Sequence, residues 1–443
     1  MLTDPRTGDR RELTADPLSV DDAVAAARAA FPVWSGLTPR YRSRRLLALA
    51  EAIESNGDAF VAAERAGTGK PLADAVSEVE TAADVLRFYA GALRAELTPA
   101  SGHRLPGHES WVRWEPLGVV AAIVPWNYPL LMAMWRIGPA LAAGNTVVLK
   151  PAETTPDSAL LLARFAREIL GADVLVALPG DRETGRRLVE SAVDMVAFTG
   201  SQRGGLDVSA RAGLRRVSLE LGGNCAAIVL PDAPAGTYDA IVAACTYNAG
   251  QSCAAPARVL ALRENYDEVV QGLADAMAAR HAGPDFGPLN NPDQAARLDD
   301  ILSRTAAGVQ RVGGLRLAEG EAGGYWRAGR ILADLPADDP AVVEEVFGPV
   351  LTVQAASGPG ELIHLANGVP QALAASVWGT NMGPAMTLAA ALDCGEVWLN
   401  CHLEQTAELP HGGRRASGQG TDLSVLALAE YQRPKTITAR LTL

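Results

Sequence analysis

The chain has 443 residues, of which 48% are hydrophobic and 20% are charged, and its formal net charge is −12. This length and apolar content are enough for a large protein of two or three structural units with a packed core. The acidic balance argues against a general nucleic-acid binder, because the phosphate backbone attracts basic surfaces.

The sequence has the marks of a cytoplasmic protein. Residues 1–17 are polar, without the apolar stretch of a signal peptide, and the apolar runs 117–125 and 225–230 are too short to span a membrane. Five cysteines at irregular spacing form no disulfide framework, and six histidines form no HxxxH or HxH pattern. We therefore expect reduced thiols in the cytoplasm, with no membrane partner and no protein-bound metal.

The first hundred residues predict helices, and strands alternate with helices from residue 110 onward. Helical periodicity and its breaks at Pro32 and 67–71 predict helices at 20–31, 42–66 and 72–94. Beyond them, apolar runs predict strands at 110–115, 118–124, 146–149, 174–178 and 195–199, with helices at 129–143 and 156–170. This order predicts a parallel α/β sheet with crossover helices.

A second α/β pattern begins after Glu220. It consists of a strand, a helix and a strand, at 225–230, 238–248 and 257–262. The alternating end of the chain, 436–443, predicts a terminal strand that needs a partner, and the strand at 110–115 supplies part of one. Edge strands of this kind often pair between subunits.

Cys253 is the first candidate for chemistry. It follows a predicted helix, and the small residues Ala254 and Ala255 leave it sterically open. A thiol is a strong nucleophile when its pKa is lowered or a base stands nearby, although a cysteine taken alone is more often a small core residue. The core interpretation prevails for the other four cysteines, which lie in apolar or strand-like contexts: Cys225, Cys245, Cys394 and Cys401.

Glu220 and Asn127 are candidate partners of a nucleophile. Glu220 ends an apolar segment and precedes two glycines, a setting in which desolvation would raise the pKa of a general base. Asn127 lies between two prolines after a buried strand, where its amide would suit a developing oxyanion. Taken singly, each residue has a simpler explanation. Glu220 would be an exposed carboxylate at the end of an element, and Asn127 would hydrogen-bond the backbone of its own turn.

Two further strand ends have the character of a ligand site. Gly200, Ser201 and Gly205 lie in a strand-to-helix turn, where phosphates bind helix N-termini. Lys150 ends another strand, with Glu153 three residues later, and this pair suits ribose hydroxyls. A solvated strand end is the alternative, but ligands of open α/β sheets do bind at the carboxyl ends of strands.

Glu345 and Phe347 precede a tight turn. The acid would suit a sugar hydroxyl and the ring a planar heterocycle, whereas an ordinary loop anchored by a buried phenylalanine is the simpler interpretation. Taken together and in order, six motifs resemble the aldehyde dehydrogenase superfamily: PWNYP, KPAE, FTGSxxxG, ELGG, GQxC and EVFGP. The resemblance extends from about Asp4 to the C-terminus.

The resemblance implies a role for each candidate. Cys253 would attack an aldehyde, Asn127 and the backbone N–H of Cys253 would hold the oxyanion, and Glu220 would activate the water that hydrolyses the thioester. The remaining positions would bind NAD, with NADP as an alternative that the carboxylate of Glu153 disfavours: Trp126, Lys150, Glu153, Gly200, Ser201, Gly205, Glu345 and Phe347.

The C-terminal pattern PHGG…SGxGxDxS is similar to the aminoaldehyde branch, which includes gamma-aminobutyraldehyde and betaine aldehyde dehydrogenases. The resemblance places Glu404 and Gln405 at the substrate entrance, where Glu404 would recognise a cationic end or would simply be an exposed loop acid. It places Asp422 where many relatives have an acid that helps proton exit. We also expect the chain to lack the family's opening hairpin.

The implied fold has a Rossmann-type cofactor lobe, an α/β catalytic lobe and a β-strand oligomerisation arm. The cofactor domain would comprise 1–98 and 117–221, the catalytic domain 222–430, and the arm 99–116 and 431–443, within a homodimer or homotetramer. The reaction would be oxidation of an aldehyde to a carboxylic acid. A catalytically silent binding protein is the alternative, and it would predict loss of Cys253 or Glu220, both of which are present.

Overall fold

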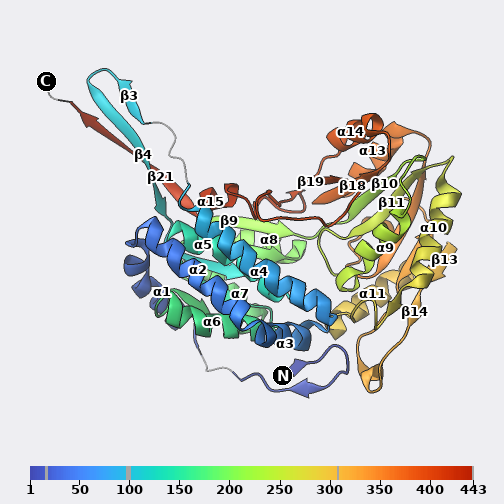
Figure 1. The fold of residues 1–443 in the computed structure, drawn as a ribbon, viewed down its shortest axis with the longest axis horizontal. Coiled ribbons are helices and arrows are strands. Elements are labelled where there is room, and N and C mark those ends of the chain that lie inside the picture. The colour runs from blue at the N-terminus through green and yellow to red at the C-terminus, as the bar shows by residue number, and fades with distance from the viewer. Residues whose placement is uncertain (15–17, 96–100, 307–308, 442–443) are drawn as a thin grey trace.

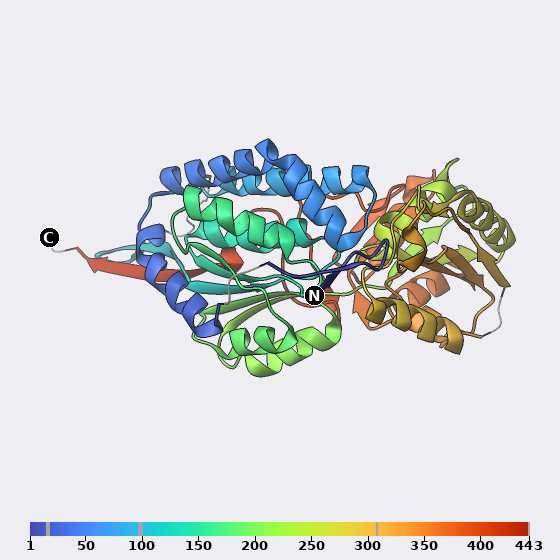
Figure 2. The ribbon, with the colours of Figure 1, turned by 90° about the horizontal axis from the view of Figure 1, so that it is seen from below.

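The computed structural model of the chain describes residues 1–14, 18–95, 101–306 and 309–441. Two α/β lobes lie side by side, and a long β arm projects from the first lobe (Figures 1 and 2). This architecture confirms the predicted fold class. The predicted boundary between residues 98 and 99, and the last two residues of the predicted strand 436–443, lie outside the described residues.

The first lobe contains a five-stranded parallel sheet in the order β7-β6-β5-β8-β9. Every residue of β5 and β6 is buried, which accounts for their continuous apolar sequences. The bounds of the strands are β5 Val119–Ile123, β6 Thr146–Lys150, β7 Leu175–Ala177, β8 Met195–Gly200 and β9 Arg216–Leu221. The predicted strands at 118–124, 146–149, 174–178 and 195–199 are thereby confirmed.

Helices cover both faces of this sheet. Their bounds are α1 Val20–Ser35, α2 Pro39–Ser55, α3 Gly57–Thr68, α4 Leu72–Ala92, α5 Pro129–Ala143, α6 Asp157–Ile169, α7 Arg182–Glu190 and α8 Gln202–Arg211. Val120 and Ala122 of β5 face a core shared with α2, α4, α5 and α6, whereas Val119 and Ala121 face a core shared with α1, α7 and α8. The alternation of a strand's side chains thus builds two cores from one sheet.

Two predicted helix ends are wrong. Pro32 lies inside α1, which continues to Ser35. The break fails because a proline near the end of a helix removes only one hydrogen bond, and Trp34 anchors the last turn by donating to the carbonyl of Leu141 at 3.1 Å. The predicted helix at 42–66 is two helices, α2 and α3, separated at Asn56.

The second lobe contains a seven-stranded sheet in the order β13-β15-β16-β11-β10-β18-β19, parallel except for β13. The strands are β10 Cys225–Val229, β11 Pro256–Leu262, β13 Val309–Val312, β15 Arg330–Ala333, β16 Val350–Ala356, β18 Ala374–Trp378 and β19 Glu396–Leu399. The helices are α9 Thr237–Thr246, α10 Tyr266–Ala279, α11 Pro292–Arg304, α12 Pro340–Val343, α13 Pro359–Asn367 and α14 Met382–Ala391. The second α/β pattern after Glu220 is therefore confirmed.

A short hairpin opens the chain, so the prediction that it lacks one is wrong. Strands β1 Leu2–Thr3 and β2 Arg10–Arg11 pair antiparallel. The ladder is too short for an alternating apolar pattern, and the hairpin is held by the second lobe instead. Tyr325 donates its N–H to the carbonyl of Pro5, and the indole of Trp326 donates to the carbonyl of Arg6, both at 2.9 Å.

The arm is a three-stranded antiparallel sheet. Strand β21 Gln432–Arg440 pairs along its whole length with β4 His108–Pro116, which also pairs with β3 Gly102–Leu105. Figure 1 shows this arm extending away from both lobes. The predicted pairing of the terminal strand with 110–115 is confirmed, whereas its role in assembly stays a prediction.

The segment between β19 and β21 returns from the second lobe to the first. It carries β20 Arg414–Arg415, which pairs antiparallel with β17 Gln371–Ala372 before β18, and helix α15 Leu426–Glu430. Leu423, Leu428 and Tyr431 join the core of the first lobe, so the chain crosses the space between the lobes before residue 423. Within the described residues, no helix has both the length and the apolar character needed to cross a membrane.

Candidate active site

Two cavities meet at Cys253, between the lobes. The first, of about 550 Å³, lies beside α8 and is called the α8 cavity; its lining includes Asn127, Glu220 and Glu345. The second, of about 660 Å³, lies beside α9 and is called the α9 cavity. Their linings share Met132, Trp135 and Cys253, so a group on the cysteine sulfur is accessible from both sides.

Cys253 is presented by a tightly bonded loop after α9. Asn248 and Gly250 adopt left-handed backbone conformations, with φ of 48° and 72°. The side chain of Gln251 donates to the carbonyl of Asn248 at 2.9 Å and accepts from the backbone N–H of Asn290 at 2.8 Å. The side chain of Gln251 therefore ties the loop that carries Cys253 to its own preceding turn and to the segment at Asn290.

The surroundings of Cys253 favour its neutral form. Burial raises the pKa of the thiol well above its usual value, and Cys225, Glu345 and Glu220 add to this effect. The backbone N–H of Ala254 opposes them. Within the described part of the chain, no cationic group stands among the causes that shift this pKa, so the environment favours the thiol over the thiolate.

Asn127 is fixed close to this loop. Its side-chain amide donates to the carbonyl of Gln251 at 2.9 Å, and its own backbone carbonyl accepts from the amide of Asn248 at 2.9 Å. Its buried oxygen Oδ1 has no hydrogen-bond partner among the described residues. The predicted oxyanion donor and the predicted nucleophile thus belong to one bonded unit.

A buried ion pair is hydrogen-bonded to the backbone of Asn127. Lys70 and Glu78 form a salt bridge in which both side chains are almost wholly inaccessible, and Lys70 Nζ also donates to the carbonyl of Asn127 at 3.2 Å. The same ammonium lies 4.5 Å from the centre of the Tyr128 ring. Because breaking a buried pair leaves an uncompensated charge, this cluster fixes the loop before α5.

Glu220 is a buried carboxyl with raised basicity. Burial raises its pKa well above the usual value, the charge of Asp422 raises it further, and Arg136 opposes both. Neither carboxyl oxygen has a hydrogen-bond partner among the described residues. This raised pKa agrees with the setting that the sequence predicted, and the ionised form of such a carboxyl is a stronger base than an ordinary carboxylate.

Glu345 and Phe347 come from the loop before β16. Glu345 Oε1 accepts the N–H of Gly223 at 2.9 Å, and burial raises the pKa of this carboxyl to about 7. Phe347 has a left-handed backbone, with φ of 54°, and its ring packs edge-on against Trp126 at 5.5 Å. The loop before β16 and the loop after β5, which carries Trp126, therefore place an acid and two aromatic rings in the lining of the α8 cavity.

A third cavity, of about 260 Å³, continues from the α8 cavity to the carboxyl ends of β6 and β8. Trp126, Gly200 and Ser201 line both, and Lys150 and Glu153 line the third. The hydroxyl of Ser201 accepts the N–H of Gly204 and so caps α8 at its N-terminus. Lys150 Nζ lies 4.0 Å from Glu153, and this ion pair is exposed at its acidic end.

The α9 cavity is lined by aromatic and small residues. The rings of Tyr128 and Tyr247 stack with centroids 6.2 Å apart, and Ala240 and Ala244 of α9 leave room opposite them. Glu404 and Gln405 lie in the lining as predicted. The carbonyl of Glu404 accepts the indole N–H of Trp398 at 2.8 Å, which fixes its backbone.

The comparisons with known proteins agree with this geometry. The sequence profile of the aldehyde dehydrogenase family matches residues 9–437. Betaine aldehyde dehydrogenase of Bacillus subtilis is 34% identical over 94% of this chain and 88% of its own, and human retinal dehydrogenase 2 is 32% identical over 99% and 88%. The chain belongs to the aldehyde dehydrogenase family.

The fold of this aldehyde dehydrogenase is also shared by solved structures. Betaine aldehyde dehydrogenase from Staphylococcus aureus, determined in complex with NAD+, is similar with a TM-score of 0.94 and 28% sequence identity, over 99% of this chain and 91% of that one. The resemblance drawn from the six motifs is therefore confirmed at the level of the superfamily. Membership makes the chain an oxidoreductase that acts on aldehydes.

One predicted ligand residue of this aldehyde dehydrogenase lies away from the described cavities. Gly205 is buried in the first turn of α8, where an added Cβ would lie 2.6 Å from Leu221 of β9. Its absent side chain allows the helix to pack closely on the sheet. Gly205 therefore positions the N-terminus of α8, and Gly200 and Ser201 line the cavity there.

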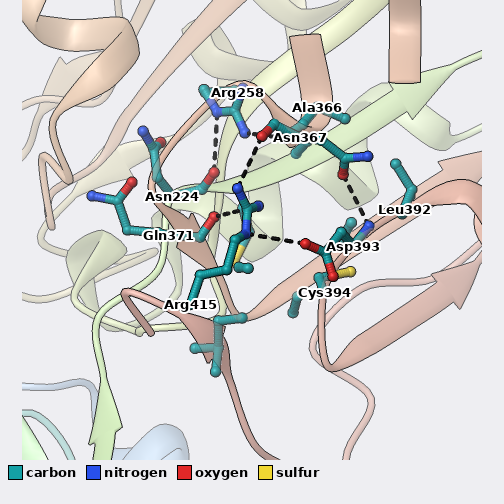
Figure 3. A pocket seen from close by; sticks show the side chains of 15 residues that line it. Asn224, Arg258, Ala366, Asn367, Gln371, Leu392, Asp393, Cys394 and Arg415 are labelled. Atoms are coloured by element: carbon teal, nitrogen blue, oxygen red, sulfur yellow. Dashed lines mark hydrogen bonds and ion pairs between the residues drawn. The ribbon is translucent and has the colours of Figure 1, made fainter. Parts of the chain in front are cut away.

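A small cavity lies behind the loop of Cys253. It holds about 20 Å³, is lined by residues that include Cys225, Arg258 and Arg415, and has room for about one water molecule. Figure 3 shows Arg258 beside the carbonyl of Asn224, to which it donates at 3.0 Å, and Arg415 paired with Asp393. Cys225 donates weakly to the carbonyl of Cys253 at 3.5 Å, so this region supports the loop from behind.

Sequence reasoning missed several residues of the site. Met132, Trp135 and His411 line the α8 cavity, and Lys70, in the link between α3 and α4, donates to the loop of Asn127. The motif PHGG contained His411, but nothing in its spacing pointed to a partner. The GTGKP run that holds Lys70 was interpreted only as a helix break.

Proposed function

We propose that this enzyme oxidises an aldehyde to its carboxylic acid through a thioester on Cys253, with NAD as the hydride acceptor. The observation that carries the proposal is the position of Cys253, which lines both large cavities. A substrate in the α9 cavity and a cofactor in the α8 cavity would then meet at the sulfur atom. Such proximity supplies much of the catalysis of a two-substrate reaction.

In the acylation step, Cys253 Sγ bonds to the aldehyde carbon, its S–H proton passes to water in the cavity, and the carbonyl oxygen takes up negative charge. The amide of Asn127 and the backbone N–H of Cys253 stabilise that charge. Removing one such donor typically slows catalysis by about 10²–10³-fold. The hydrogen bonds that fix the Asn127 backbone and the buried pair beneath it keep this donor in place while the charge develops.

The connected cavities at α8 fit NAD. The capped N-terminus of α8 presents backbone N–H groups for the diphosphate, with Gly200 and Ser201 beside it. Lys150 and Glu153 would bind the adenosine ribose and Glu345 the nicotinamide ribose, while Phe347 and Trp126 would lie against the cofactor. The carboxylate of Glu153 disfavours the 2′-phosphate of NADP. NAD bound there supplies a hydride acceptor.

In the deacylation step, Glu220 takes a proton from the water that attacks the thioester. Its raised pKa makes it a stronger base than an ordinary carboxylate. A semialdehyde dehydrogenase that transfers the acyl group to coenzyme A would not need this base. The presence of Glu220 therefore favours hydrolysis over transfer.

The direct test is a panel of aldehydes with NAD or NADP, followed by the absorbance of the reduced cofactor. We expect reduction of NAD with at least one aldehyde, a weaker reaction with NADP, and no reaction by the Cys253→Ala variant. A thermal unfolding curve like that of the wild type shows that the variant is folded. Failure of every aldehyde to give cysteine-dependent reduction would overturn the proposal.

We infer an aminoaldehyde as the substrate class, on the strength of the PHGG…SGxGxDxS pattern and of Glu404. This carboxylate lies at the wall of the α9 cavity, where it would attract a substrate ammonium group. The test compares 4-aminobutanal with pentanal, which has a methyl group in place of the ammonium. We expect a higher kcat/KM for 4-aminobutanal, and a loss of the difference in Glu404→Gln. Equal values in the wild type would rule out charge recognition.

The remaining proposals concern assembly and location. The arm has an exposed edge strand, β21, which favours pairing with a second copy in a homodimer or homotetramer. All five cysteines are free thiols, which suits a reducing compartment such as the cytoplasm. We expect no nucleic-acid partner, because the chain is acidic.

A further inference from the structure

A histidine outside the proposed catalytic set faces the same cavity as Glu220. His411 lies on the segment that returns to the first lobe, where its backbone forms an antiparallel bridge with Asp422. The ring is almost wholly buried and packs edge-on against Trp135, with centroids 5.1 Å apart. His411 lines the α8 cavity together with Glu220 and Cys253.

The imidazole of His411 is paired with a carboxylate. Its Nδ1 lies 3.0 Å from Oε2 of Glu396, the first residue of β19, and the Gln405 amide lies within 3.3 Å of the same oxygen and 2.9 Å of Nδ1. A lone pair on Nδ1 would leave two acceptors 3.0 Å apart, so the proton sits on Nδ1 and is donated to Glu396. The neutral ring then offers Nε2 as a base, as in other histidine–carboxylate pairs.

Glu220 lies close to this pair. A Cβ added to Gly412, the neighbour of His411, would lie 3.2 Å from Oε1 of Glu220, and one added to Gly420 would lie 3.1 Å from it. The carboxyl group therefore packs against the backbone that carries the histidine. Because both positions are glycine, no side chain of theirs presses on the carboxyl or fills the cavity beside it.

The other charged groups near His411 are poorly suited to carry a proton away. Arg136 and Asp422 form an ion pair at 3.1 Å, and both side chains are wholly inaccessible. The guanidinium also donates to the hydroxyls of Thr199 and Ser218, and it does not lose its proton in proteins. The Glu396 side chain, in contrast, is 15% exposed, so the pair with His411 connects the cavity to solvent.

We propose that His411, paired with Glu396, takes the proton that Glu220 removes from the hydrolytic water and passes it to solvent. The water oxygen bonds to the thioester carbon, the C–S bond breaks, and Cys253 leaves as a thiolate. The proton moves from Glu220 through cavity water to Nε2 of His411, and the carboxylate of Glu396 stabilises the charged ring through its contact with Nδ1. Nε2 then returns the proton to water that exchanges with solvent, which restores both Nε2 and Glu220 as bases. This inference rests on the proposed thioester mechanism.

The test separates acylation from deacylation in His411→Gln. The enzyme is mixed rapidly with NAD and an aldehyde, the burst of NADH reports acylation, and intact mass after quenching reports the decay of the acyl-enzyme. We expect an unchanged burst rate, an acyl-enzyme decay at least about tenfold slower, an unchanged kcat/KM for the aldehyde, and partial rescue by added imidazole. The exposed His364→Gln on α13 is the matched control and should behave like the wild type.

Wild-type decay of the acyl-enzyme in His411→Gln would overturn the proposal. A raised KM with unchanged decay would also overturn it, because His411 would then be a substrate contact. If His411→Gln does not fold, Glu396→Gln decides: it keeps the imidazole, and its decay should be slowed and respond to buffer concentration, whereas wild-type decay contradicts the proposal. Reduction of NAD by Cys253→Ala at the wild-type rate would refute the thioester mechanism itself, which is a different result.

Discussion

At Glu220, burial and the charge of Asp422 together raise the pKa of the carboxyl, and the guanidinium of Arg136 opposes them. The same burial raises the pKa of the Cys253 thiol. Both groups of the proposed mechanism are therefore held in their neutral forms more strongly than in water. In the proposed mechanism the raised pKa of the thiol opposes acylation, and the raised pKa of Glu220 opposes deacylation, which needs the ionised carboxylate.

The raised pKa of Glu220 sets the expected pH dependence of deacylation. A raised pKa means that Glu220 keeps its proton to a higher pH than the usual value of about 4.3, so the fraction of active base grows as the pH rises above that value. We expect the decay rate of the acyl-enzyme to increase with pH well beyond the range in which ordinary carboxylates titrate. The measurement is acyl-enzyme decay by quenching and intact mass across pH 5–9. A rate that is flat over this range would exclude Glu220 as the base.

Sequence motifs predicted the residues that would react, but not those that support them. Cys253, Asn127 and Glu220 lie in short motifs after predicted strands or helices, and all three line the α8 cavity. Lys70 donates to the carbonyl of Asn127, which is 57 residues later in the chain, and His411 contacts Glu396, which is 15 residues earlier. Such contacts depend on how distant segments fold together, and no local spacing encodes them.

At the scale of elements, the loop between α9 and β11 depends on close backbone packing. Gly250 has a φ of 72°, which favours glycine, and an added Cβ would meet the backbone of Gly348 and Pro349. Gly348 belongs to the loop that carries Glu345 and Phe347. The loops of the nucleophile and of the predicted cofactor residues therefore pack directly on each other.

Replacement of Gly250 by alanine should separate these loops. The left-handed backbone alone costs about 1–2 kcal/mol in an L residue, and the backbone contact adds to it. We expect a fall of several degrees in the thermal midpoint and a loss of at least about tenfold in kcat/KM. The control is Gly91→Ala, an exposed site in α4 where nothing lies near the new methyl group. Equal behaviour of the two variants would show that the loop tolerates a side chain.

Most elements could be predicted from periodicity, and the exceptions have local causes. The strands of the first sheet are continuous apolar runs because they are buried on both faces. Pro32 was expected to end its helix, yet α1 continues because Trp34 packs beyond it. The opening hairpin was missed because two residue pairs give no pattern, and its contacts lie on the second lobe.

At the scale of the whole molecule, the chain leaves the first lobe once and returns to it. Residues 423–431 complete the core of the first lobe after the second lobe, whose sheet extends from Cys225 at the start of β10 to Leu399 at the end of β19. The return segment carries His411 and Asp422 across the α8 cavity. The sequence predicted the two lobes from their repeated patterns, but the return path has few regular elements and left no periodic signal.

The arm provides a test of assembly. Strand β21 lies at the edge of its sheet and projects away from both lobes (Figure 1), so its free edge is available to another copy. We expect the wild type to have the mass of a dimer or tetramer by light scattering. Removal of residues 432–443 should give a smaller species, whereas removal of 441–443 alone should not. A truncated chain with the wild-type mass would place the interface elsewhere.

The central claim is that Cys253 carries the acyl group and Glu220 releases it, and intact mass tests both at once. The Glu220→Gln variant keeps the size and burial of the side chain but removes the base. With NAD and an aldehyde substrate, it should form about one NADH per active site and then stall, with the mass of the enzyme raised by one acyl group that is absent from Cys253→Ala. Continued turnover of Glu220→Gln at the wild-type rate, or an NADH burst without any adduct, would contradict the account.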